Sequence, residues 1–159
     1  MLRVILISLM MFAAAPASAD KFDDAYSAYK RGDYSTALRL WRLAAEQGNA
    51  SAQHNLGAMY DKGRGVPQDY AEAAKRSRLA AKQGNAPAQN NLGAMYDKGH
   101  GVLQDNITAH MWFNIAGANS SEYGVTNRNG LAENMTPADI SEAQRRARVC
   151  MNSNYQDCD

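Results

Sequence analysis

Apolar residues recur along the chain at the spacing of an amphipathic helix. Ala52, Leu56 and Tyr60 follow one another every fourth residue and so form a single apolar stripe. The glycines of Gly63-x-Gly65 break this helix, and Asp69 is placed to cap a second helix through its side-chain oxygen. The pattern predicts a pair of helices joined by a short connection.

This pair of helices is encoded twice. The nine residues NLGAMYDKG occupy positions 55–63 and, unchanged, 91–99, so their starts lie 36 positions apart. Between the wider windows 52–69 and 88–105, fifteen of eighteen positions are identical. Self-similarity at this period is typical of a solenoid, in which each unit buries its apolar stripes by stacking on its neighbours.

The flanking segments add further helices to these two units. Upstream, the pattern predicts a helix over 22–31, a Gly-Asp-Tyr turn and a helix over 37–45. Downstream, it predicts a weaker helix over 122–133 and a well-capped one that begins at Thr136-Pro137-Ala138-Asp139 and runs to about Met151. We expect an all-α fold, an α/α superhelical solenoid of about four helical hairpins without strands.

Each repeated unit carries a glycine inside its first helix. Gly57 follows Leu56 directly, and Gly93 holds the same position in the next unit. A glycine in a helix interior costs about 1 kcal/mol relative to alanine, and a helix tolerates that cost where a neighbouring backbone must approach closely. We therefore predict that both glycines lie at helix–helix contacts.

The first nineteen residues have the features of a secretory signal peptide. Arg3 supplies a positive charge, residues 4–12 are apolar, and Ala17-Ser18-Ala19 fits a small-residue cleavage site. The segment is too short for a membrane-spanning helix, and a buried N-terminal helix is the structural alternative. We expect residues 1–19 to be removed and the mature protein to be periplasmic or secreted, without stable membrane insertion.

The expected mature chain, residues 20–159, is long enough for one domain with a core. It contains two cysteines, Cys150 and Cys158, whose spacing fits neither a zinc site nor a CxxC redox motif. In an oxidising compartment an even count favours a disulfide. The repeat divides the domain into a degenerate first repeat over 22–48, repeats over 52–84 and 88–119, and a disulfide-bonded C-terminal helical cap over 120–159.

The charge balance argues against two classes of partner. The chain has 17 basic and 16 acidic residues, and removal of Arg3 leaves the two equal. A balanced chain lacks the electrostatic footprint of binding to nucleic acid or to an anionic membrane. The basic clusters at 75–78 and 145–148 fall late in predicted helices, where cations complement the helix dipole, so we interpret them as solvated faces.

The repeated motif resembles the Sel-one-like repeat (SLR), a branch of the tetratricopeptide-repeat superfamily. The motif reads A-x-x-x-L-G-x-x-Y-x-x-G-x-G-V-x-x-D, followed by A-x-x-x-x-x-x-A-A-x-x-G. Residues 52–84 and 88 to about 117 match it closely, and the upstream GDYSTALRLW is closer to the ordinary tetratricopeptide form. The resemblance implies a superhelix whose first helices line a concave, partner-binding groove. It also implies a scaffold or adaptor role, as in bacterial envelopes, with no assigned reaction.

The side chains rotated away from the stack identify a candidate binding face. We expect a protein or peptide partner, with an envelope polymer as a second candidate, along a shallow trough formed by the first helices; an empty solvated face is the alternative. The candidate residues are His54, Ala58, Asp61 and Lys62 in one unit, and Asn90, Ala94, Asp97 and Lys98 in the next.

Catalytic motifs are weak in this chain. Ser27 and Lys30 form an S-x-x-K tetrad, the spacing used by penicillin-recognising enzymes, but S-D-N and K-T-G are missing. His54, His100 and His110 lack metal-ligand spacing, so we interpret them as structural, and no Gly-rich phosphate-binding motif is present. We predict no enzyme activity, cofactor or metal. A penicillin-binding or β-lactam-hydrolysing protein using Ser27 is the alternative, and labelled β-lactam would distinguish the two.

Overall fold

The computed structural model describes residues 17–158, with side chains from residue 22 onward. All but the last three residues of the predicted signal peptide, 1–19, lie outside this range. The described chain forms eight α-helices and no strands, as the sequence predicts. They are α1 (Ala17–Lys30), α2 (Tyr34–Glu46), α3 (Ala50–Lys62), α4 (Tyr70–Ala81), α5 (Ala86–Lys98), α6 (Asn106–Ala118), α7 (Glu122–Ala132) and α8 (Pro137–Asn152).

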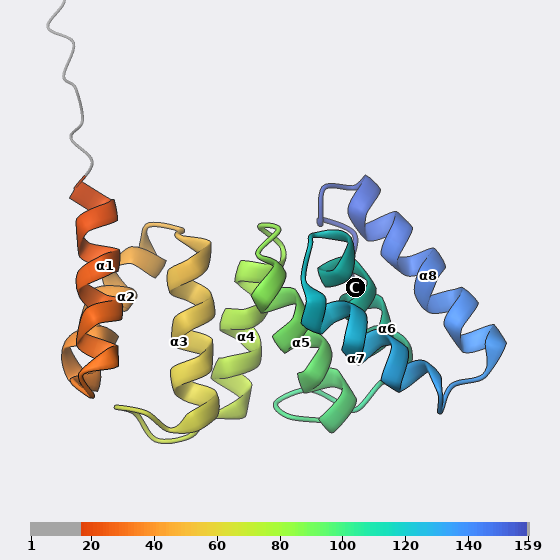
Figure 1. Ribbon diagram of the computed structural model, residues 1–159, viewed down its shortest axis with the longest axis horizontal. Helices are drawn as coiled ribbons and strands as arrows, with labels where there is room; N and C mark the ends of the chain where they lie inside the picture. The colour runs from red at the N-terminus through yellow and green to blue at the C-terminus, as the bar shows by residue number, and fades with distance from the viewer. Residues whose placement is uncertain (1–16, 159) are drawn as a thin grey trace, which may run out of the picture.

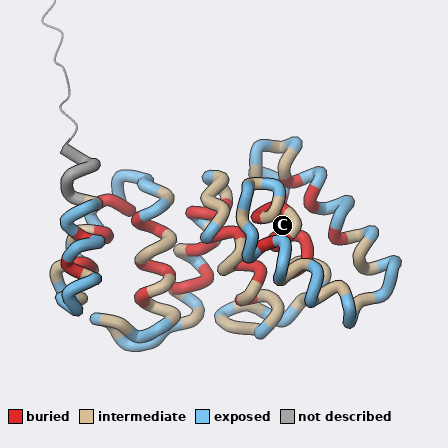
Figure 2. The backbone as a smooth tube through the Cα atoms, in the orientation of Figure 1, coloured by how far each residue is buried: buried red, intermediate tan, exposed pale blue. Residues whose placement is uncertain are grey.

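The helices follow one another along the long axis of the molecule, from α1 at one end to α8 at the other (Figure 1). Each helix from α1 to α6 packs on the next one in the chain. Buried residues follow the faces where neighbouring helices meet, and exposed residues cover the outside (Figure 2). This arrangement confirms the predicted helical repeat solenoid.

Aspartate caps begin the second helices of the first three pairs, α2, α4 and α6. The side chain of Asp69 accepts a hydrogen bond from the backbone N–H of Glu72 at 3.0 Å, and Asp33 accepts one from Thr36 at 3.1 Å. Asp105 accepts from Thr108 at 3.1 Å. Each cap satisfies one of the N–H groups that a helix start leaves without an intrahelical partner, so the three second helices begin at equivalent positions.

Within a unit, the interior glycines allow the two helices to approach closely. A Cβ atom added at Gly57 would lie 3.2 Å from the carbonyl oxygen of Ala73 in α4. At Gly93, an added Cβ would lie 2.7 Å from the Phe113 ring and 3.1 Å from the carbonyl oxygen of Ala109 in α6. Both glycines are therefore packing residues, as predicted.

Between units, a buried glutamine joins α3 to α2, and its counterpart joins α5 to α4. The Gln53 amide donates to the carbonyl oxygen of Ala45 near the end of α2, at 3.3 Å. Gln89, 36 positions later, donates in the same way to Ala81 of α4 at 3.1 Å. Because both side chains are buried, these bonds give each amide N–H group a partner, at carbonyls that also accept from the backbone N–H groups of Gly48 and Gly84.

The connections between helices also contact the preceding unit. An added Cβ at Gly65 would lie 2.8 Å from the Cβ of Tyr34, at the start of α2. Gly101 meets the backbone of Tyr70, at the start of α4, so closely that a side chain has no room. Both glycines have positive φ angles, which a residue with a side chain adopts only at a cost. Glycine is therefore required at this position of the repeat for two reasons.

The C-terminal end is built on α6. The last two helices, α7 and α8, each pack on α6 more than on one another. Cys150 in α8 and Cys158 form a disulfide, and both are buried in a core that includes Trp112 of α6. The hydroxyl of Tyr155 accepts a hydrogen bond from the Asn119 amide at 2.9 Å. The polar tail is therefore bonded covalently to α8 and held against the third unit by noncovalent contacts.

Replacing Gly93 by alanine should lower the free energy of unfolding by roughly 1–2 kcal/mol, because overpacking against Phe113 outweighs the gain in helix propensity. The matched control is Gly130→Ala in α7, where an added Cβ meets nothing within 4 Å. That variant should be neutral or up to about 1 kcal/mol more stable. Urea denaturation measures both; equal effects at the two sites would contradict a close contact at Gly93.

Removing the disulfide with the Cys150→Ser and Cys158→Ser double substitution should lower the free energy of unfolding by roughly 2–3 kcal/mol, the chain-entropy value for so short a loop. Chemical denaturation of the oxidised protein and of this variant measures the difference. Two titratable thiols in protein isolated without reductant would contradict the bond.

Candidate functional site: a groove along the first helices

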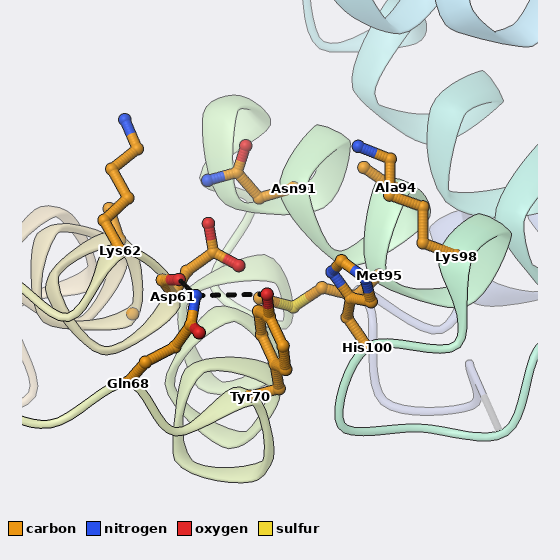
Figure 3. Close-up of a pocket in the computed structure, with 11 residues that line it drawn as sticks. Asp61, Lys62, Gln68, Tyr70, Asn91, Ala94, Met95, Lys98 and His100 are labelled. Carbon is orange, nitrogen blue, oxygen red and sulfur yellow. Dashed lines mark hydrogen bonds between the residues drawn. The ribbon is translucent and has the colours of Figure 1, made fainter.

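A polar pocket of about 450 Å³ lies between the second and third units, where α3 faces α5. We call it the inter-unit pocket. Figure 3 shows the Asp61 carboxylate and the Asn91 amide, from neighbouring helices, on one side and the Tyr70 and His100 rings below them in this view. The lining residues are Gly57, Ala58, Asp61, Lys62, Gln68, Tyr70, Asn91, Ala94, Met95, Lys98 and His100.

Several polar groups of the inter-unit pocket are not used by the protein itself. In the part of the chain that the structure describes, the side chains of Asp61, Asn91 and Lys98 have no hydrogen-bond or ion-pair partner. Asp61 and Asn91 are partly buried, and Lys98 is exposed. A carboxylate, an amide and an ammonium group are therefore available to bind the polar groups of another chain.

Gln68 and His100, which lie in the connections between helices, shape the base of this pocket together with Tyr70 of α4. The Gln68 amide donates to the backbone carbonyl of Asp61 at 2.7 Å and to the Tyr70 hydroxyl at 3.0 Å. The Tyr70 ring stacks on the ring of His100, with 4.2 Å between centroids. Since Tyr70 belongs to the second unit and His100 to the third, this stack joins the two units.

A second pocket, of about 490 Å³, lies on the other side of α5, between α5 and α7. It shares Ala94 and Lys98 with the inter-unit pocket. Small residues occupy corresponding positions in three helices, namely Ala58, Ala94 and Gly130, and each lines at least one of the two pockets. We call the two pockets together the first-helix groove, because α3, α5 and α7 each begin a helix pair.

The structure brings six of the eight residues predicted from the sequence to this groove: Ala58, Asp61, Lys62, Ala94, Asp97 and Lys98. His54 and Asn90 do not line either pocket. The Asn90 side chain instead accepts a hydrogen bond from the Asn127 amide at 2.9 Å, and so joins α5 to α7. His54 is partly buried, and its Nδ1 atom has no hydrogen-bond partner in the described chain.

Six residues that line the inter-unit pocket were not predicted as groove residues: Gln68, Tyr70, Asn91, Met95, His100 and Gly57, which was predicted only as a helix contact. The sequence contains a signal for the first, because Gln104 recurs 36 positions later and makes the same bond to the carbonyl of Asp97, at 2.7 Å. Tyr70 likewise has a counterpart in Tyr34 at the start of α2. Gln68 and Tyr70 reach the pocket only because the connection between α3 and α4 folds back toward α3. Helical periodicity in the sequence does not predict that path.

The S-x-x-K tetrad lies apart from the groove. Ser27 and Lys30 are both exposed on α1, and the Lys30 ammonium group lies 5.2 Å from the centre of the Tyr26 ring. Nothing in this geometry directs the lysine at the serine hydroxyl, and no pocket described above includes either residue. The structure therefore adds no support to the alternative of a β-lactam-binding serine.

The basic clusters are largely engaged within their own helices. Arg76 is paired with Glu72 at 2.6 Å, and Arg145 and Arg146 both contact Glu142, at 2.7 and 2.8 Å. Over residues 17–158, no group of three His, Cys, Asp or Glu side chains is arranged to hold a metal ion. None of the described helices is both long and apolar enough to cross a bilayer.

The fold and the groove define an α/α repeat protein whose units stack through the same contacts. The chain belongs to the Sel1 repeat family, whose model matches residues 26–49, 50–85 and 86–121. Sel1 repeats generally mediate protein–protein interaction and are generally not catalytic. No protein of curated function matches the chain.

Two solved structures of this repeat class are similar to the chain. A protective antigen present in uropathogenic Escherichia coli strains, with an SLR fold, is 28% identical, with a TM-score of 0.81 over 87% of this chain. The chain spans only 31% of that protein's length. A Sel1 repeat protein from Oxalobacter formigenes is 34% identical, with a TM-score of 0.64, over 71% of this chain and 88% of that one.

Two imidazoles, the partly buried His54 and the buried His110, should make stability depend on pH. Burial lowers the pKa of His54 from its ordinary 6.5, and burial, with the Arg128 charge as a smaller cause, lowers the pKa of His110. The unfolded chain therefore takes up protons near pH 6.5 that the folded chain takes up only at lower pH. The free energy of unfolding should be fully retained above pH 6.5 and fall as the pH decreases below it.

Urea denaturation of the wild type and of His110→Gln between about pH 5 and about pH 7.5 tests this, and the variant should show the shallower slope. The Glu142 carboxylate contributes little in this range, because its effect on stability develops mainly as the pH falls from its ordinary pKa of 4.5 toward the value of about 2 that its two arginine partners produce. The prediction is wrong if both proteins are equally stable at the two ends of this range.

Proposed function

We propose that this chain is a non-enzymatic interaction module of the bacterial cell envelope, which binds an extended segment of a partner protein along the first-helix groove. The observation that carries the proposal is the pair of pockets that meet at Ala94 and Lys98. Together they offer a surface of mixed polar and apolar residues across three helices. Membership of the Sel1 repeat family supports the class of function.

The chemistry of the groove favours an extended chain over a small molecule. Ala58, Ala94 and Gly130 keep the trough open because they have little or no side chain. The unpaired amide and carboxylate of Asn91 and Asp61 are suited to the N–H and C=O groups of a main chain. An extended segment presents such groups at regular intervals and has no internal partners for them.

The envelope setting rests on two observations. The sequence features of residues 1–19 are those of a cleavable signal peptide. The Cys150–Cys158 bond is of the kind that persists in an oxidising compartment such as the periplasm. We therefore propose a periplasmic or secreted location for the mature protein.

The test uses the mature protein carrying a photo-crosslinking residue in place of Lys98, which lies at the junction of the two pockets. The matched control places the same residue at Ala138, exposed on α8 and outside the groove. A protein cross-linked from envelope extract at Lys98 but not at Ala138 is identified by mass spectrometry. Its cross-linked segment is then made as a peptide.

Binding of that peptide should be weakened roughly tenfold or more by Ala94→Arg, because the new side chain fills the trough where the pockets meet. Ala138→Arg should leave the affinity unchanged. Calorimetry measures both, and circular dichroism confirms that the variants are folded. Equal cross-linking from the two positions, or an affinity that Ala94→Arg leaves unaltered, rules out the groove as the binding site.

A further inference from the structure

The first and second units meet through three aromatic and cationic side chains. The Tyr29 ring, at the end of α1, lies 5.4 Å from the Tyr34 ring. The Arg64 guanidinium, from the connection of the second unit, lies 5.6 Å from the centre of the first ring and 5.9 Å from the second. It also donates a hydrogen bond to the Tyr29 hydroxyl. The Tyr29 ring thus fills the space beside the Tyr34 and Arg64 side chains.

The second and third units repeat two of these three side chains. Tyr70 follows Tyr34, and His100 follows Arg64, each 36 positions later. They too are in contact, since the His100 ring stacks on the Tyr70 ring. Arg64 and Tyr34 of the first interface therefore have positional counterparts, His100 and Tyr70, at the second.

The third side chain differs between the two interfaces. The backbone N–H of Asp33, the cap of α2, bonds to the carbonyl of Ala28 at 3.0 Å, and that of Asp69, the cap of α4, bonds to the carbonyl of Tyr60 at 3.0 Å. Ala28 and Tyr60 are therefore equivalent. The next residues, Tyr29 and Asp61, are equivalent as well.

Aspartate is too short to fill the space of a phenol ring. Asp61 lines the inter-unit pocket together with Tyr70 and His100, so the cavity of about 450 Å³ lies where the first interface has its tyrosine ring. The other walls suit an aromatic ring, because Ala58, Ala94 and Met95 offer apolar contact.

We propose that the inter-unit pocket receives a tyrosine side chain of the partner segment, which takes the place that Tyr29 fills at the preceding interface. This inference rests on the proposed function and names the anchor residue of its ligand. The ring packs beside Tyr70 and His100. Its hydroxyl finds hydrogen-bond partners in the Asp61 carboxylate and the Asn91 amide, which have none in the described chain.

Methionine methyl groups provide a direct readout. Met95 lines the inter-unit pocket, whereas its counterpart Met59 is buried beneath Gly65 at the preceding interface. The mature protein, labelled with 13C at the methionine methyls, is titrated with an acetylated and amidated Gly-Gly-Tyr-Gly-Gly peptide. We expect a saturable ring-current shift of the Met95 signal and no shift of the Met59 signal.

Two variants fill the pocket from within. Asp61→Tyr recreates the arrangement of the first interface, and Ala58→Leu adds bulk at a position whose α1 counterpart is the large Tyr26. Each should weaken the apparent affinity for the peptide roughly tenfold or more. Met59 signals that match the wild type confirm that the fold is retained. If one variant fails to fold, the other still decides the question.

Peptides with phenylalanine, arginine or alanine in place of tyrosine complete the test. Tyrosine should bind more tightly than each of them. The proposal is overturned if the alanine peptide shifts Met95 equally, if arginine binds better, or if both folded pocket-filling variants keep full affinity. Partner capture at Lys98 that persists in those variants would reject the tyrosine anchor alone. If the protein with the cross-linker at position 98 and no other change captures no partner, the proposed function is rejected. The result of the peptide titration does not depend on that outcome.

Discussion

A buried glutamine at the start of each repeated unit is the interaction on which the stacking of this protein depends. Gln53 and Gln89 donate to carbonyl groups at the ends of α2 and α4, and their own oxygens accept from Gln83 and Asn119, at 2.7 and 2.8 Å. A hydrogen-bonded polar group in an apolar contact allows one registration of two helices and disfavours sliding, because any shift leaves buried groups unpaired. The units therefore stack in the same way, and pockets between them form at repeated places.

The helices and their caps could be predicted from the sequence because their causes are local. Asp69 caps α4 through a bond that reaches only three residues along the chain, and periodic apolar positions determine which face is buried. Gly57 and Gly93 could be placed at helix contacts for a different reason, namely that the same helix-weakening residue recurs at one period. The sequence carries no such signal for the position of α8, because the contact of α8 with α6 depends on how the C-terminal segment folds back.

The groove could be predicted only in part. Ala58 and Ala94 were identified from helix geometry alone, whereas Asn91 was missed in favour of its neighbour Asn90, which turns toward α7. One position on a helix corresponds to a rotation of about 100°, so a small error in the assumed orientation exchanges a groove residue for a contact residue. Tyr70 and His100 could not be placed, since they reach the pocket from a second helix and a connection whose paths depend on tertiary packing.

The contacts of Gly65 with Tyr34 and of Gly101 with Tyr70 have a consequence for the evolution of this architecture. Inside a unit, the partner of the interior glycine varies, from Ser77 in one unit to the much larger Phe113 in the next. Between units, the contacting residues are the same. A duplicated segment of 36 residues therefore carries a matching surface at each of its two ends, whatever its interior has become. Such a chain can lengthen or shorten by whole modules through unequal recombination, with no need to redesign the joints.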